Sequence, residues 1–147
     1  MLACEDARAR PVRSTFNKLW LIRCCGYKFY KLVAMTNCIL NSGSILGTPA
    51  GFDRLAEIML TPCLDTNMTH GSDQAKLMWG FYGQQFGNLS VTTERRGMGV
   101  INTMRYAPHV TEKYTRVLPM DEVQWPKRMP FTVYNDDNRT VSAMIHQ

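Results

Sequence analysis

Apolar residues recur at helical spacing through the first hundred residues and predict several short helices. The first helix is expected to begin at Ser14 or Thr15, either of which can cap it. It should run to about Leu40, with a weak point at Gly26. The polar residues 41–44, Asn-Ser-Gly-Ser, are interpreted as a linker that follows this helix.

The second helix carries the clearest boundary signals in the chain. Thr48 is a good N-cap, Pro49 suits the first helical turn, and Pro62 ends the helix. The spacing predicts one buried apolar face formed by Phe52, Leu55, Ala56 and Met59.

Further helices are predicted downstream. One begins at Ser72 or Asp73, and its apolar side consists of Leu77, Met78, Phe81 and Phe86. A helical stretch is expected around residues 100–104, and another between Pro108 and Pro119.

The periodicity changes to two near the C-terminus. Residues 131–134 and 139–142 alternate around the polar residues 135–138, which predicts a β-hairpin. The predicted fold is therefore mainly α, with several short amphipathic helices and a C-terminal hairpin, docked on partner subunits rather than globular. We divide it into a basic N-terminal arm and interfacial helix (1–44), a helical body (45–128) and a hairpin tail (129–147).

Positive charge is concentrated near the N-terminus. The chain carries 17 Lys and Arg against 12 Asp and Glu, and there is no acidic residue between Ala7 and Phe52. Such an arm is expected either to bind an anionic surface or to form a solvated face. Its cations alternate with aromatic rings, which suits contact with lipid headgroups or with another subunit, and an ordinary helix is the alternative. The partner-binding candidates here are Trp20, Arg23, Lys28 and Lys31.

The sequence contains little that points to catalysis. The three histidines, His70, His109 and His146, lie far apart and outside metal-ligand spacing. No catalytic residue, cofactor or metal is therefore predicted, and the protein is not expected to be an enzyme.

The cysteines and sequons are expected to carry no modification. The five cysteines form no Cys-x-x-Cys pair and are interpreted as free thiols in a reducing compartment. The sequons at Asn67, Asn88 and Asn138 are interpreted as chance matches, because no secretory leader precedes them.

Nucleic-acid binding is the alternative function. The basic side chains of Arg95, Arg96, Arg105, Lys113 and Arg116 are predicted to form one face, with Tyr106 and Tyr114 available for stacking. In this interpretation the chain is a mitochondrial ribosomal protein that binds RNA.

Blocks of sequence also resemble a known family. Residues 50–55, Ala-Gly-Phe-Asp-Arg-Leu, are similar to an opening motif of the ubiquinol–cytochrome c reductase binding protein family, a matrix-facing accessory subunit of respiratory complex III. The resemblance continues, in the same order, through Glu94-Arg95-Arg96, Arg105, Thr111-Glu112, Val117-Leu118-Pro119 and Trp125.

The resemblance implies a mostly helical subunit without a redox centre, docked on cytochrome b and the core subunits at the matrix side of the mitochondrial inner membrane. Arg54, Arg95 and Arg105 would be ion-pair anchors. Phe52, Arg96 and Trp125 complete the partner-binding candidates. The expected function is thus assembly and stabilisation of a respiratory complex by a non-catalytic accessory subunit. The acid-poor N-terminus is interpreted as a retained mitochondrial signal.

Overall fold

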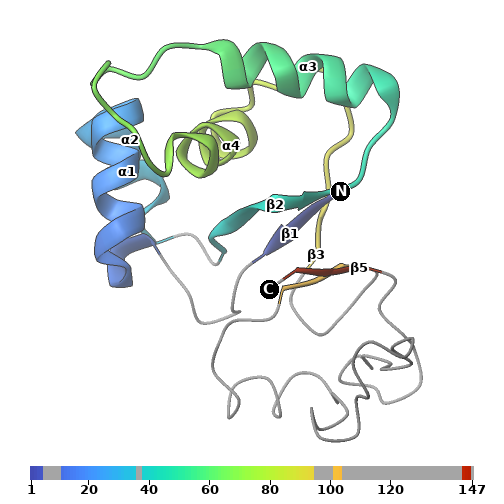
Figure 1. The fold of residues 1–147 in the computed structure, drawn as a ribbon, viewed down its shortest axis with the longest axis horizontal. Helices are drawn as coiled ribbons and strands as arrows, with labels where there is room; N and C mark the ends of the chain where they lie inside the picture. The colour runs from blue at the N-terminus through green and yellow to red at the C-terminus, as the bar shows by residue number, and fades with distance from the viewer. Residues whose placement is uncertain (5–10, 36–37, 95–100, 104–143, 147) are drawn as a thin grey trace, which may run out of the picture.

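A computed structural model describes residues 1–4, 11–35, 38–94, 101–103 and 144–146 (Figure 1). Helices predominate among these residues, so the mainly α prediction is confirmed at that level. In chain order the elements are β1 (Leu2–Cys4), the 3-10 helix η1 (Pro11–Arg13), α1 (Thr15–Cys25), α2 (Tyr27–Val33), β2 (Leu40–Ile45), α3 (Pro49–Leu60), α4 (Ser72–Tyr82), β3 (Thr93–Glu94), β4 (Ile101–Thr103) and β5 (Met144–His146).

The predicted first helix is divided in two. The Ser14 hydroxyl caps α1 by accepting from the backbone N–H of Asn17, as the sequence predicted. Gly26 has φ +89° and lies between the two helices. Its N–H donates to the Ile22 carbonyl at the end of α1, and its carbonyl accepts from the Tyr30 N–H in α2. The expected continuation to Leu40 is wrong, because α2 ends at Val33 and Leu40 begins a strand.

The interpretation of residues 41–44 as a linker is also wrong, since they lie within β2. In a three-stranded sheet of order β2-β1-β3, β1 pairs antiparallel with β2 and parallel with β3. Asn41 and Ser44 are buried in β2, and the Asn41 side chain accepts from the backbone N–H of Gly43. Pairing with β1 and packing against α4 therefore override the turn preference of these polar residues.

A third correction concerns residues 100–104, which were predicted to be helical. Ile101–Thr103 form β4, which pairs in parallel with β5. The predicted hairpin strands and the helix between Pro108 and Pro119 lie outside the described residues.

Helix α3 has the predicted boundaries but a different buried face. The Thr48 hydroxyl accepts from the Gly51 N–H, Pro49 is in the first turn, and the helix ends at Leu60. Leu55 and Ile58 are buried, whereas Phe52 is 45% exposed and Ala56 is exposed. The predicted face is thus wrong at Phe52 and Ala56, because α3 presents the Leu55–Ile58 side to α4.

Helix α4 lies at the centre of the core. It packs against α1, α3 and β2, which surround it in Figure 1. Leu77 and Met78 on this helix have no exposed surface, as predicted for its apolar side, while Phe81 is half-buried and Phe86 lies past the helix end. One apolar cluster joins α4 to Leu21 and Leu40, so residues from the N-terminal arm share a core with the helical body.

Candidate protein-docking surface

Large apolar side chains are exposed chiefly on the first two helices. Within the described residues, six of the ten exposed large hydrophobic side chains lie between Val12 and Met35. We define the α1–α2 surface as the exposed residues Phe16, Lys18, Leu19, Arg23, Tyr27, Lys28, Lys31, Leu32 and Met35.

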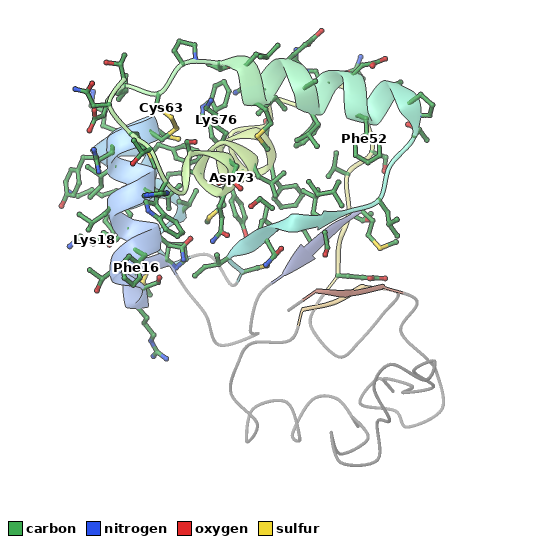
Figure 2. The ribbon with its side chains drawn as sticks, in the orientation of Figure 1. Phe16, Lys18, Phe52, Cys63, Asp73 and Lys76 are labelled. Carbon is green, nitrogen blue, oxygen red and sulfur yellow. A yellow bond between two sulfur atoms is a disulfide. The ribbon has the colours of Figure 1, made fainter. Side chains whose placement is uncertain are left out.

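The backbone of α1 explains how this surface forms. Leu21 and Cys24 point into the core, so residues on the other side, including Phe16, Leu19 and Arg23 at the spacing i, i+3, i+7, remain outside. Phe16 is 70% exposed. In Figure 2, Phe16 and Lys18 lie at the lower part of α1, far from α3.

Two lysines of this surface lie over aromatic rings, that of the exposed Tyr27 and that of the buried Tyr30. The Lys31 Nζ lies 5.1 Å from the centroid of the Tyr27 ring, and the Lys18 Nζ lies 5.8 Å from that of Tyr30. At these distances the cations are attracted to the ring faces. They cover part of the aromatic area, and their charges remain available to solvent or to a partner.

The predicted binding residues on this surface have different roles. Lys28 and Lys31 are exposed, as a partner-binding role requires. Trp20 is half-buried and lies against Gly71, where a Cβ atom would come within 2.0 Å of the indole ring. The Arg23 Nε donates to the Asp65 Oδ2 at 2.7 Å, and this hydrogen bond holds the pKa of the Asp65 carboxyl below its usual value. Trp20 and Arg23 therefore also stabilise the fold.

Two other predicted residues lie on α3, away from this surface. The Arg54 Nε donates to the Gln85 carbonyl at 2.7 Å, and its guanidinium pairs with Glu57. Arg54 thus connects α3 to the turn after α4. Phe52 borders a cavity of about 180 Å³. The remaining candidates, Arg95, Arg96, Arg105 and Trp125, lie outside the described residues.

The cavity beside Phe52 is mostly apolar. Its lining includes Leu2, Ile45, Leu55 and Phe86, from β1, β2, α3 and the turn after α4. No titratable side chain is among its lining residues in the described chain. The lining therefore suits contact with apolar groups.

Sequence reasoning missed a polar network between the elements. Gln74 in α4 donates its Nε2 to the Asn17 Oδ1 at 2.6 Å, and both side chains are buried. Nearby in the chain, the Ser42 hydroxyl in β2 donates to the Asp73 Oδ2 at 2.7 Å. These partners are distant in sequence, and each bond fixes α4 to a neighbouring element. The one local signal for these hydrogen bonds is the polar character of Asp73 and Gln74 at the start of α4.

A disulfide overturns the prediction that all cysteines are free thiols. Cys24 on α1 is bonded to Cys63, 39 residues later, and Cys38 is also disulfide-bonded. Two backbone bonds place the segments together, from Leu64 N–H to the Cys24 carbonyl and from Asp65 N–H to the Arg23 carbonyl. Cys25 is a free thiol, and burial raises its pKa to about 11, opposed by the charge of Lys76.

Comparisons with known proteins do not extend this picture. No protein-family model, curated protein or solved structure matches the chain. The resemblance to the complex III subunit therefore stays an expectation. None of the helices in the described ranges is long and apolar enough to span a membrane. Within residues that the structure describes, no three His, Cys, Asp or Glu side chains group as a metal site would require.

Proposed function

We propose that this protein is a non-catalytic binding subunit that docks on an acidic protein face through the α1–α2 surface. The observation that carries this proposal is the exposure of Phe16, Leu19, Tyr27, Leu32 and Met35 among cations. Clustered exposed apolar side chains are typical of interaction sites. Buried aromatic anchors with a charged rim are typical of protein interfaces.

Charge favours an acidic partner. Residues 11–35 contain five Lys or Arg and no Asp or Glu. Complementary charge accelerates association and selects against basic partners. Arg23 is already paired with Asp65, so Lys28 and Lys31 at the rim are the better steering charges.

The arrangement suits a protein better than a lipid surface. A helix that lies in a membrane interface separates a broad apolar face from a charged face. On α1 the exposed Phe16 and Leu19 share their side of the helix with Arg23, and on α2 Leu32 follows Lys31 directly. Inserting these apolar side chains into lipid would also bury cations, whereas carboxylates on a protein can pair with them.

The disulfide favours an oxidising compartment for this docking. Disulfides persist outside compartments where glutathione and thioredoxin keep thiols reduced. The proposal therefore keeps the partner-binding role that the complex III resemblance implied and does not retain its matrix-side location. The ribosomal alternative depends on Arg95, Arg96 and Arg105, outside the described residues.

Site-specific photocrosslinking tests this proposal. A photoreactive phenylalanine analogue would replace Phe16 in the full chain, and the matched control would carry it at Leu60, which is 83% exposed at the end of α3. We expect a protein adduct from position 16 and not from position 60. Its yield should fall when Lys28→Glu and Lys31→Glu are added. Lipid or RNA adducts, or identical products from both positions, would refute the proposal.

A further inference from the structure

Two of the three sequons lie on exposed turns of the folded chain. Asn67 and Thr69 are exposed in the segment between α3 and α4. Asn88 and Ser90 are exposed after α4, where Gly87 turns the chain with φ +63°. The third sequon, at Asn138, lies outside the described residues.

The local backbone leaves room for a large modification at both positions. Neither asparagine lies in a helix or a strand, so a glycan there would disturb no backbone hydrogen bond of a helix or a pair of strands. The Asn67 N–H donates to the Asp65 Oδ1 at 3.0 Å, which fixes the local conformation of this turn. Buried asparagines such as Asn17 and Asn41 are not followed by a Ser or Thr two residues later.

The disulfides supply the independent observation that changes the meaning of these sequons. Cys24 and Cys63 are bonded, and Cys38 is in a disulfide as well. The compartments that form disulfides in eukaryotic cells include the lumen where asparagine-linked oligosaccharides are added. Exposed sequons and disulfides in the same chain thus point to the same place of folding.

We propose that Asn67 and Asn88 are N-glycosylation sites, modified when the chain folds in the secretory lumen. The donor is an oligosaccharide linked to a lipid pyrophosphate. The asparagine Nδ2 attacks the anomeric carbon, a C–N bond forms, and the bond from that carbon to the pyrophosphate oxygen breaks. The amide loses one proton and the lipid pyrophosphate is the leaving group.

The two glycans would cover part of the molecular surface. The glycans would stand on the turns on either side of α4, beside the exposed Leu64 and Leu89. The α1–α2 surface contains no sequon. Glycosylation therefore excludes partners from the two turns. The turn that carries Asn67 lies next to α1, because Asp65 pairs with Arg23 on that helix.

The test uses the full chain with a secretory leader in cultured animal cells, in a background with Asn138→Gln. Whole-cell and secreted material would be treated with an amidase that releases N-glycans and converts each modified asparagine to aspartate, which peptide mass spectrometry locates. We expect conversion at both Asn67 and Asn88. Thr69→Ala should abolish the first and Ser90→Ala the second, whereas Thr66→Ala, an exposed threonine in the same turn but outside the sequon, should retain both.

The chain used for this reading must carry the Cys24–Cys63 disulfide. If one asparagine is not converted to aspartate, its assignment as a glycosylation site is overturned. If neither is converted, the proposal is overturned. The same chain expressed in the cytosol should be unmodified. These readouts do not involve the α1–α2 surface. Failure of the photocrosslinking experiment and failure of this one are therefore distinguishable.

Discussion

Removal of the Cys24–Cys63 disulfide should be the most costly single change in covalent structure that we can specify. The bond closes a loop with a sequence separation of 39 residues. In the chain-entropy description, losing a cross-link over a loop of this length frees the unfolded chain and lowers the free energy of unfolding by about 4 kcal/mol at 25 °C. A loss of this size is a large fraction of the stability of an ordinary domain.

The perturbation is the double variant Cys24→Ala and Cys63→Ala, and its matched control is Cys25→Ala. Cys25 is adjacent to Cys24 in sequence, is half-buried and forms no disulfide. Its replacement by alanine therefore removes packing contacts but leaves the cross-link in place. We expect the control to lose about 1 kcal/mol.

Equilibrium unfolding in urea, followed by tryptophan fluorescence and circular dichroism in non-reducing buffer, measures both effects. Besides the lower midpoint, the denaturant dependence m should increase for the double variant, because its unfolded chain exposes more surface. If the double variant unfolds within about 1 kcal/mol of the Cys25→Ala control, the loop argument is refuted.

Three further predictions concern single residues. Gly71→Ala should lower the free energy of unfolding by about 2–4 kcal/mol, since φ is +71° and the new Cβ would overlap the Trp20 ring. The control Gly87→Ala, with φ +63° and open space around the new Cβ, should lower it by only about 1–2 kcal/mol. Equal losses for the two variants in thermal unfolding would exclude the ring contact as the cause. Thr48→Ala should lower the free energy of urea unfolding by about 1 kcal/mol through loss of the α3 cap, whereas Thr48→Ser should retain it. In the folded protein, Cys25 should be alkylated slowly at pH 8, and the rate should rise up to about pH 11. In urea, the rise in alkylation rate should centre at about pH 8.5. If the pH dependence of the rate is the same in urea, burial is not the cause of the raised pKa. Because the unfolded thiol ionises first, stability from this group is present below about pH 8.5 and is lost as the pH rises towards about 11.

The helices could be predicted where their signals are local. Ser14 and Thr48 cap with hydrogen bonds to residues three positions later, so the sequence alone contains both partners. Gly26 was expected to weaken a helix, and its positive φ ends one. In each case the deciding interaction lies within one helical turn.

The strands could not be predicted because their partners are remote. Residues 41–44 have the composition of a turn, and their strand conformation depends on pairing with β1 at the other end of a long segment. The Cys24–Cys63 bond depends on the same kind of information, since a spacing of 39 residues favours no particular pairing.

Of the candidate site, the sequence could predict the exposure of some residues. Lys28 and Lys31 are exposed as expected, because a segment without acidic residues has few internal partners for its cations. Arg54 was expected to anchor a partner, and it binds Gln85 of the same chain. That contact spans 31 residues, and no periodicity around Arg54 signals it.

The middle position of β1 has a consequence for how the chain matures. Its residues 2–4 precede both partner strands along the chain, because one neighbour comes from Leu40–Ile45 and the other from Thr93–Glu94. During synthesis, the edge of β1 that faces β2 can pair once residues 40–45 have emerged, whereas the edge that faces β3 stays unpaired until residues 93–94 follow. Such long-range closure slows folding and leaves a template for misassembly, so nascent chains should depend on chaperones until β3 arrives.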